Sequence, residues 1–343
     1  MSLRILYIGP LNPWGTCLSR MRGLIEFGMQ VIPFDVEIYL NKKKGSILDR
    51  LPIPIRNKNT EFKQLNEALL DKVFLTVPDI IWVDKGYYLW PNTLMEIKKR
   101  HKSLILHHCT DDIMRQEHIM NNYFDSLIHY DAHYTSNKFN IDELKSMTDS
   151  HIGYNEIGYD HHFIKNLKIS QTGSQWKSDL FFIGHWEPNT EKYIKAIVDE
   201  NLPINVRGPG WYQSILNSDV IKSEWFYGPQ YVEAINAGKI GLGFVSKWNR
   251  NETAGRCFEI PACGTMLLAV RTNILQDLYK EGKEAEFFSD PQELMDKAKF
   301  YLNNPDERKK IAKAGMERCI LNKCSWKDRV GEIISDLSLR GLI

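Results

Sequence analysis

The sequence predicts an α/β protein of two domains, each built on a parallel β-sheet with helices on both faces. The chain has 343 residues, 43% of them hydrophobic and 25% charged, which is enough for two cores. Short apolar runs alternate with segments of helical period in the first half, and the same alternation restarts near residue 178. Parallel strands joined by helices need right-handed crossovers, which place helices on both faces of the sheet.

Four apolar runs in the first half predict buried strands, with helices between them. The predicted strands are residues 4–11, 29–36, 79–86 and 103–109. The predicted helices are residues 17–28, closed by Gly28, then about 60–75, and 91–101. A basic, proline-containing stretch, residues 42–58, precedes the second of these helices.

The second half repeats the pattern and ends in helices. The predicted strands are residues 178–184, 203–208 and 239–245, with a further buried strand after Gly264. The predicted helices are residues 189–200, about 229–237, 305–323 and 326–340. A polar stretch without clear period, residues 160–177, marks the junction. We expect domains at residues 1–162 and 163–324, followed by a terminal helix at 325–343.

Composition excludes several classes of protein. Lys and Arg total 44 against 43 Asp and Glu, so bulk charge favours neither a nucleic-acid partner nor a membrane surface. Six cysteines without a CxxC pair form neither a disulfide framework nor a zinc pattern. No signal region opens the sequence, and no window approaches the roughly 20 apolar residues of a membrane span. We expect a cytoplasmic protein that is not transmembrane.

The segment "NETAGRCFEIPACG", residues 251–264, carries groups that fit a nucleotide. If it is helical from about Thr253 to Ala262, Thr253, Arg256 and Glu259 fall on one face. Arginine offers a fork of donors to phosphate, and a carboxylate accepts hydrogen bonds from ribose hydroxyls. The alternative is an ordinary Arg256–Glu259 surface ion pair. Pro261 should kink or shorten the helix.

The run "FEIPACGTMLLA" resembles the "E-A-M-A-C-G-x-P-V-I" segment of retaining glycosyltransferases of the GT-B fold. "RCFEIPACG" is similar to the CgeB-like (spore-maturation-protein-like) branch of the group 1 glycosyltransferases, as is the longer stretch 231–264. "NEIGYDHHF" is similar to the segment that opens the second domain of GT-B enzymes. The resemblance implies two Rossmann-like domains facing a cleft, with a C-terminal helix that crosses back to the first domain.

The resemblance also implies a donor site in the second domain and no essential metal. Glu259 aligns with the glutamate that binds ribose in the family, and Arg256 would neutralise charge on the leaving diphosphate. Many group 1 enzymes carry another glutamate eight positions earlier, where this chain has Asn251, with Glu252 one residue off register. The candidate donor-binding residues are Gly184, His185, Arg207, Gly208, Trp248, Asn251, Thr253, Arg256 and Glu259.

The first domain is expected to hold the acceptor. Its first loop, "YIGPLNPWGTCLSR", lacks the G-x-G-x-x-G fingerprint, which disfavours a dehydrogenase. Charged groups at the ends of two predicted strands would face the cleft: Asp111 or Asp112 would orient or deprotonate an acceptor hydroxyl, and His108 would contact the donor sugar. Helix capping by Asp111 or Asp112 is the alternative. The other candidate cleft residues are Gly9, Asn12, Trp14, Asp84 and Lys85.

These patterns, together with the resemblance, lead us to expect a metal-independent glycosyltransferase of glycan biosynthesis that uses a nucleoside diphosphate sugar and no cofactor. Retention of anomeric configuration is implied by the resemblance alone. The acceptor class stays open among glycan, lipid-linked and protein acceptors, as do the donor base, the donor sugar and the oligomeric state. Two alternatives remain: an epimerase or hydrolase of nucleotide sugars on the same fold, and a non-catalytic nucleotide-sugar-binding protein.

Overall fold

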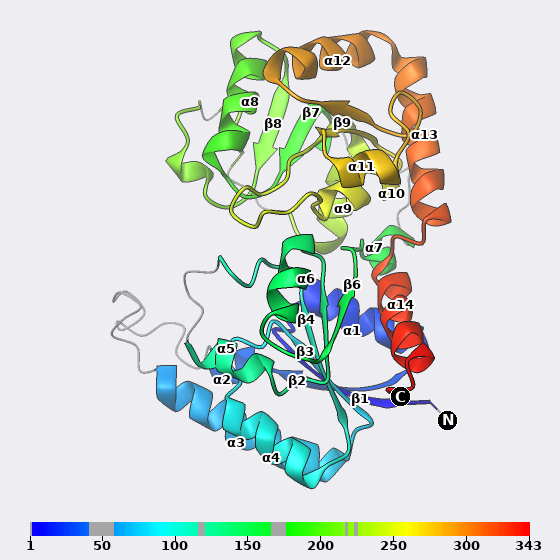
Figure 1. Ribbon diagram of the computed structural model, residues 1–343. Helices are drawn as coiled ribbons and strands as arrows, with labels where there is room; N and C mark the ends of the chain where they lie inside the picture. Colours follow the sequence, from blue (N-terminus) through cyan, green and yellow to red (C-terminus); the bar gives the residue numbers. More distant parts are fainter. Residues whose placement is uncertain (1, 41–57, 116–120, 166–175, 217–218, 223–225) are drawn as a thin grey trace. The chain divides into compact units, whose positions relative to one another are not determined.

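The computed structural model describes residues 2–40, 58–115, 121–165, 176–216, 219–222 and 226–343 (Figure 1). The chain forms two compact units. The first unit consists of Met1–Glu156 and Lys327–Ile343, and the second unit is Ile157–Trp326. The basic stretch 42–57 and the middle of the expected junction, residues 166–175, lie outside the described residues.

The first unit contains a six-stranded parallel sheet in the order β2-β1-β3-β4-β5-β6. Its strands are β1 (Arg4–Gly9), β2 (Gln30–Asp35), β3 (Ile80–Asp84), β4 (Leu104–Cys109), β5 (Ala132–Thr135) and β6 (His151–Tyr154). The four strands predicted in this half of the chain are confirmed. The sequence did not predict β5 and β6, because each has only four residues and neither is a continuous apolar run.

Helices cover both faces of this sheet. They are α1 (Thr16–Glu26), α2 (Glu37–Leu40), α3 (Lys58–Thr76), α4 (Pro91–Arg100), α5 (Asn121–Leu127), α6 (Lys138–Lys145) and α14 (Trp326–Leu339). Successive side chains of β1 point to opposite faces. Leu6 and Ile8 pack with residues of α3 and α4, whereas Ile5 and Tyr7 pack with residues of α1 and α14. The first unit is therefore doubly wound, as predicted.

The last helix of the chain, α14, belongs to the core of the first unit. Val330, Ile333 and Leu337 are at most 1% exposed and lie in one cluster with Leu24 of α1. A Cβ built on Gly331 would lie 2.6 Å from the Phe27 ring, so the helix passes very close to the end of α1. Figure 1 shows α14 in red beside α1 in dark blue. The crossover helix that the resemblance implied is present.

The second unit contains a five-stranded parallel sheet in the order β11-β10-β9-β7-β8. Its strands are β7 (Ser178–Ile183), β8 (Ile204–Arg207), β9 (Gly238–Gly243), β10 (Met266–Val270) and β11 (Glu286–Phe288). Its helices are α7 (His161–Lys165), α8 (Pro188–Asp199), α9 (Gly228–Ala237), α10 (Arg256–Ala262), α11 (Asn273–Leu278), α12 (Pro291–Asn303) and α13 (Pro305–Leu321). The predicted strands and helices of this half are confirmed to within a few residues.

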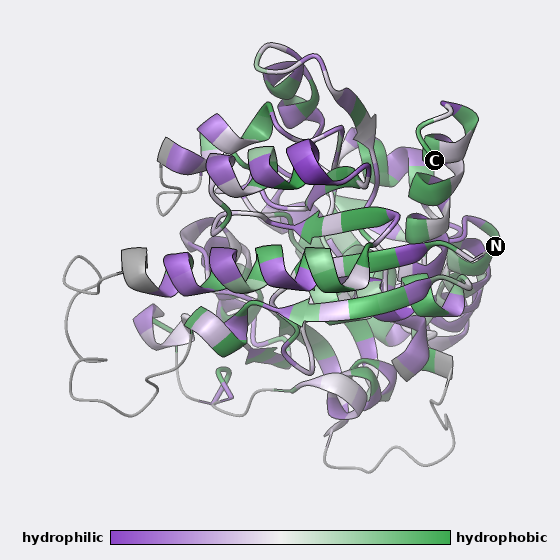
Figure 2. Ribbon diagram, turned by 90° about the horizontal axis from the view of Figure 1, so that it is seen from below, coloured by the Kyte–Doolittle hydropathy of each residue, from purple (hydrophilic) through white to green (hydrophobic). Residues whose placement is uncertain are grey.

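In the second unit, too, successive side chains of a strand point to opposite faces of the sheet, and each face is covered by its own apolar layer. Leu180 and Phe182 of β7 pack with residues of α8, α12 and α13. Phe181, between them, packs with residues of α9, α10 and α11. Figure 2 shows helices on which hydrophobic and hydrophilic residues alternate along the chain, as amphipathic helices require.

The two segments that connect the units are hydrogen-bonded to each other. Tyr159 donates its N–H to the Cys324 carbonyl at 3.0 Å, and the Trp326 N–H donates to the Tyr159 carbonyl at 3.0 Å. A Cβ built on Gly158 would lie 2.9 Å from the backbone nitrogen of Trp326, so the segments approach closely. Both ends of the second unit are therefore tied together at one point.

Candidate functional site

The carboxyl ends of β7 and β8 meet in a contact that leaves room only for glycine. The Gly184 N–H donates to the Arg207 carbonyl at 2.8 Å. Gly208 has φ +132°, and a Cβ built there would lie 2.2 Å from the Gly184 carbonyl oxygen. A side chain at position 208 would force the two strand ends apart. This edge of the sheet therefore presents main-chain atoms that a ligand can approach closely.

Arg256 is the first residue of α10, and its guanidinium lies against this glycine edge. Its Cζ is 4.9 Å from the centre of the Phe182 ring, and Nη2 donates to the Phe244 carbonyl at 3.4 Å. A Cβ built on Gly184 would lie 2.7 Å from Nη1. Among the described residues, none accepts a hydrogen bond from Nε. The side chain is held by an aromatic ring and one long hydrogen bond, which leaves donor capacity for an anion.

Glu259 lies one turn further along α10, and within the described part of the chain only one oxygen of its carboxylate accepts a hydrogen bond. The Tyr231 hydroxyl donates to Oε2 at 2.6 Å. The other oxygen, Oε1, faces Gly255, where a built Cβ would be 3.5 Å away. Burial raises the pKa of Glu259 above its ordinary value, although the hydrogen bond from Tyr231 and the charge of Arg256 act in the opposite direction. The carboxylate therefore keeps an acceptor oxygen for a hydroxyl-bearing ligand.

The structure rules out one of the two interpretations of Arg256 and Glu259, an ion pair between them. Among the described residues, Glu259 takes its hydrogen bond from Tyr231 and forms no ion pair with Arg256. The alternative of an ordinary surface ion pair is therefore wrong. Both side chains lie at the start of the same short helix, one beside the glycine edge and one beside Tyr231.

The helical prediction for Thr253 is wrong. Helix α10 begins at Arg256 rather than near Thr253, so Thr253 is not on the helical face that carries Arg256 and Glu259. Thr253 is buried in the preceding loop, with 3% of its surface exposed, and Asn251 is half-buried in the same loop. As expected, Pro261 is accompanied by a short helix, which ends one residue later at Ala262.

Three further candidates surround this edge of the second unit. His185 is exposed at the surface, and partial desolvation of its ring, followed by the charge of Arg256, lowers its pKa. Arg207 places its Cζ 4.3 Å from the centre of the Phe226 ring, so its guanidinium stacks on an aromatic side chain. Trp248, in the loop after β9, is 58% exposed. An exposed tryptophan in a loop at the carboxyl edge of a parallel sheet is available for stacking on a flat ligand group.

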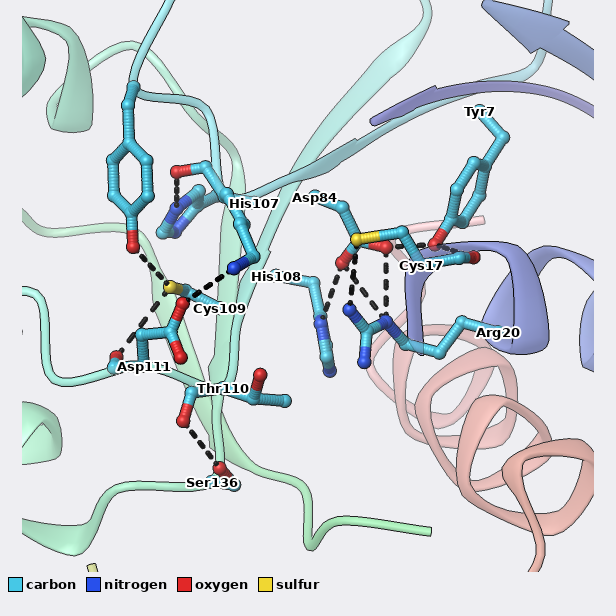
Figure 3. Close-up of polar contacts among 12 residues, drawn as sticks. Tyr7, Cys17, Arg20, Asp84, His107, His108, Cys109, Thr110, Asp111 and Ser136 are labelled. Carbon is cyan, nitrogen blue, oxygen red and sulfur yellow. Dashed lines mark hydrogen bonds and ion pairs between the residues drawn. The ribbon is translucent and has the colours of Figure 1, made fainter. Parts of the chain in front are cut away.

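In the first unit, the prediction that Asp84 and His108 face a cleft is wrong. Both are fully buried, in a network that Figure 3 shows between β3, β4 and α1. Arg20 donates from Nε to Asp84 Oδ2 at 3.0 Å, and His108 Nδ1 lies 2.9 Å from Asp84 Oδ1. Tyr7 donates to the same carboxylate. The buried guanidinium supplies the compensating charge that lets an acidic residue lie inside the fold.

Burial also sets the ionisation of this network. Desolvation raises the pKa of Asp84 well above its ordinary value and lowers the pKa of His108 well below its own. The neighbouring His107 is likewise interior, with its Nδ1 3.1 Å from His133 Nδ1 and its Nε2 3.1 Å from the Tyr123 hydroxyl. His107 and His108 therefore both belong to the interior of the first unit.

The acidic pair divides into one interior and one accessible residue. Asp112 is fully buried, and its Oδ1 accepts hydrogen bonds from the Met114 N–H at 3.0 Å and from Asn140 Nδ2 at 2.9 Å. Asp112 therefore caps the turn at Ile113 and Met114, and within the described residues no helix begins at that turn. The Asp111 side chain is 25% exposed and accepts from Lys85 Nζ at 2.8 Å. Of the two carboxylates, Asp111 is the one that a ligand can reach.

Lys85, the partner of Asp111, has an unusual backbone conformation. Its φ of +67° lies in the left-handed region, which is uncommon for a residue with a side chain. Burial alone would lower the pKa of Lys85, but the charge of Asp111 and the hydrogen bond to it raise the pKa above its usual value. The pair is therefore a lysine cation facing a carboxylate at the ends of β3 and β4.

The remaining candidates of the first unit are Gly9, the last residue of β1, and Asn12 and Trp14 in the loop that follows it. Asn12 and Trp14 are exposed, and the Gly15 N–H donates to the Asn12 carbonyl at 3.0 Å. Gly9 is buried, and a Cβ built there would lie 3.1 Å from the Cβ of Asp84. Gly9 therefore allows close packing of β1 against β3.

Sequence reasoning missed Tyr231 and Arg20. Arg20 follows Cys17 by three residues and precedes Leu24 by four, so it lies on the buried face of α1, and a cation at such a position signals a buried anion. Tyr231 lies within the stretch that resembles the CgeB-like branch, but nothing in its spacing to Glu259 indicates contact, because 28 residues separate them.

The described part of the chain shows neither a metal cluster nor a membrane-spanning helix. No group of three or more His, Cys, Asp or Glu side chains in that part of the chain is arranged to hold a metal ion. No helix there has both the length and the apolar character that a membrane crossing requires.

Residues 188–335 match a family model described as "Glycosyl transferase-like" (Glyco_trans_1_2). No curated protein sequence matches this chain. Among solved structures, sucrose-phosphate synthase from Thermosynechococcus elongatus is similar at TM-score 0.68 and 12% identity, covering 98% of this chain and 100% of that one. Anabaena Alr3699/HepE, solved in complex with UDP and glucose, is similar at TM-score 0.62 and 13% identity. The match covers 98% of this chain and 99% of that one.

A third similar structure is UDP-GlcNAc 2-epimerase from Neisseria meningitidis bound to UDP-GlcNAc, at TM-score 0.52 and 12% identity, covering 98% of this chain and 99% of that one. At these identities the similarity concerns the fold, which is GT-B with two Rossmann-like domains. The family-model match places a glycosyl transferase-like domain over most of the second unit and α14.

Proposed function

We propose that the protein is a glycosyltransferase that moves a sugar from a nucleoside diphosphate sugar to a hydroxyl-bearing acceptor. The observation that carries the proposal is the arrangement on α10: a guanidinium with spare donors and a carboxylate with a spare acceptor, one turn apart, beside the glycine contact between β7 and β8. The family-model match to residues 188–335 includes α10.

In this proposal each group of the second unit has one task. The Arg256 guanidinium binds the diphosphate and stabilises the negative charge that grows on it as the glycosidic bond breaks. Glu259 Oε1 accepts hydrogen bonds from the ribose hydroxyls. The bare backbone at Gly184 and Gly208 lets the diphosphate approach the strand ends. Trp248, Asn251 and His185 line the same edge and contact the base or sugar.

In the first unit, we assign the acceptor to the loop after β1 and to the Lys85–Asp111 pair. Asp111 is the accessible carboxylate and is the group that orients or deprotonates an acceptor hydroxyl. We propose that no metal takes part, because Arg256 supplies the positive charge that a metal would otherwise supply. We also propose retention of the anomeric configuration, on the sequence resemblance alone.

A direct test combines binding with product analysis. UDP, GDP, ADP and their sugars are screened for a rise in melting temperature, which a ligand that binds only the folded state produces. The stabilising nucleotide sugar is then incubated with candidate acceptors, with and without EDTA, and the anomeric proton of the product is observed by NMR. Transfer that survives EDTA and keeps the configuration supports the proposal. Conversion of the donor without an acceptor, to an epimer or a free sugar, contradicts it in favour of an epimerase or hydrolase.

Replacing Glu259 with Gln is expected to weaken nucleoside diphosphate binding by about 1 to 3 kcal/mol, because a charged acceptor of hydrogen bonds is lost. Glutamine keeps the shape and can still accept from Tyr231, so the packing of α10 is preserved. Isothermal titration calorimetry with the diphosphate identified in the screen measures the change. Unchanged affinity in a folded variant would remove the ribose assignment.

Glu259→Gln, which is expected to weaken binding, is not expected to weaken the fold, and its effect on stability depends on pH. The folded-state pKa of Glu259 is raised by burial, so ionising this group costs stability, and the cost is absent at low pH and grows as pH rises through the folded pKa. Glu259→Gln is therefore expected to be at least as stable as the native protein at neutral pH, with the advantage vanishing as pH falls. Thermal unfolding across pH measures the stability difference between the variant and the native protein. A variant that loses stability relative to the native protein as pH rises from acid to neutral would contradict the prediction.

A further inference from the structure

Helix α9 places a tyrosine hydroxyl on the carboxylate assigned to the ribose. Tyr231 donates to Glu259 Oε2 at 2.6 Å, and no described residue donates to Oε1. We propose that Tyr231 is a positioning residue for nucleotide binding: it fixes Glu259 through Oε2 so that Oε1 is presented to the ribose hydroxyls. This inference rests on the proposed function and extends it to a residue outside α10.

The geometry of α9 and α10 makes Tyr231 a fixed support. Asn236 Nδ2 donates to the Cys263 carbonyl at 2.7 Å, which ties the end of α9 to the end of α10. Thr265 Oγ1 donates to the Ile235 carbonyl at 2.8 Å, which ties α9 to the start of β10. Val232 and Ile235 of α9 are buried in the same apolar cluster as Phe258 and Ile260 of α10. The part of α9 that carries Tyr231 is therefore held in a fixed position relative to α10.

Electrostatics give Tyr231 a second effect on the same carboxylate. The groups that act on Glu259 are Tyr231, Arg256 and Asp160, and the charge of Glu259 raises the pKa of Cys263, the residue after α10. Burial and Asp160 raise the pKa of Glu259, whereas Tyr231 and Arg256 lower it. Burial also raises the pKa of Tyr231 well above its usual value, so its hydroxyl stays a donor. Tyr231 thus favours the ionised carboxylate, the form that accepts from two hydroxyls.

The chain offers a matched control for removing this hydroxyl. Tyr301 donates to Glu286 Oε1 at 2.6 Å, in the same unit and at the same length as the Tyr231–Glu259 bond. Tyr301 lies on α12, which packs on the other face of the sheet from α9 and α10. Tyr301→Phe therefore removes an equivalent tyrosine–carboxylate bond without touching the proposed nucleotide site.

The test compares binding of the ribonucleoside diphosphate found in the screen with binding of its 2′,3′-dideoxy analogue. Tyr231→Phe is expected to weaken the ribonucleotide about 5-fold or more and to leave the dideoxy analogue unchanged, because the analogue has no hydroxyls for Glu259. It is also expected to shift the pH midpoint of ribonucleotide binding upward, since Glu259 then protonates at higher pH. Tyr301→Phe should change neither quantity, and Tyr231→Phe should add nothing to Glu259→Gln.

The outcomes separate the positioning role of Tyr231 from the ribose site at Glu259. If Glu259→Gln weakens ribonucleotide binding but Tyr231→Phe does not, the positioning role is overturned and the proposed function stands. If neither changes binding, the ribose site itself is wrong. Equal losses for both nucleotides in Tyr231→Phe would indicate general damage to α9 and would also overturn the positioning role. Should the Phe variant not fold, 3-fluorotyrosine at position 231, a stronger donor of the same shape, must tighten ribonucleotide binding and lower the midpoint.

Discussion

Removal of residues 326–343 is expected to unfold the first unit, although the missing residues come from the far end of the chain. Helix α14 supplies Val330, Ile333 and Leu337 to the cluster that covers one face of the six-stranded sheet. Without the helix, the apolar residues of β1, β3 and β4 on that face would meet water. Deleting a single buried leucine or isoleucine side chain costs about 2 to 5 kcal/mol, so losing several is comparable to the whole stability of a typical protein, about 5 to 15 kcal/mol.

Hydrogen exchange measures this effect, and a pair of point variants controls for it. Protection in residues 2–40 and 58–115 should be lost on truncation, whereas unchanged protection there would show that α14 does not support the first unit. Leu337 is fully buried and Leu339, two residues later, is 87% exposed. Leu337→Ala is expected to lower the free energy of unfolding by about 2 to 5 kcal/mol, and Leu339→Ala by close to nothing.

Arg256→Lys is expected to lower turnover about 100-fold while weakening donor binding much less. The guanidinium lies over the Phe182 ring and reaches the Phe244 carbonyl, and its remaining donors form a planar fork. An ammonium keeps the charge but cannot offer two parallel donors as charge develops on the leaving diphosphate. Interactions made mainly in the transition state affect turnover more than ground-state binding, and losing one such donor costs roughly 100- to 1,000-fold.

The measurement is a comparison of turnover with the dissociation constant for the nucleotide sugar. Arg271→Lys is a suitable control, since Arg271, which follows β10, is fully engaged in ion pairs with Glu293, at 2.6 Å, and with Glu281. That variant should keep the native turnover. Equal losses of turnover and donor affinity in Arg256→Lys would assign Arg256 to ground-state binding and contradict its role in departure of the diphosphate.

The candidate site of the second unit was largely predictable from the sequence. Arg256 and Glu259 are three residues apart and fall at the start of a short helix after a buried strand, which is a local pattern. The glycines at 184 and 208 follow predicted strands, so their place at the carboxyl edge of a parallel sheet was also local information. The structure adds their proximity, since Gly208 and the Arg256 guanidinium both lie against Gly184.

The candidate site of the first unit was predicted less well, because the sequence does not reveal the side on which a charged residue finds its partner. Asp84 and Lys85 are neighbours at the end of β3, yet Asp84 points inward to Arg20 and Lys85 pairs with Asp111 nearer the surface. Asp111 and Asp112 are likewise adjacent, and Asp112 is buried because Asn140 lies within hydrogen-bond distance.

The sequence by itself determined the class of fold and the approximate bounds of most strands and helices. It also determined that Arg256 and Glu259 lie one turn apart on the same short helix. Those properties depend on periodicity and on residues within a few positions of one another. Tertiary structure alone decided the strand orders, the burial of Asp84, His108 and Asp112, and the contact between Tyr231 and Glu259. The physical reason is that a polar side chain is stable inside a protein only when a partner compensates its desolvation, and these partners come from distant segments that packing brings together.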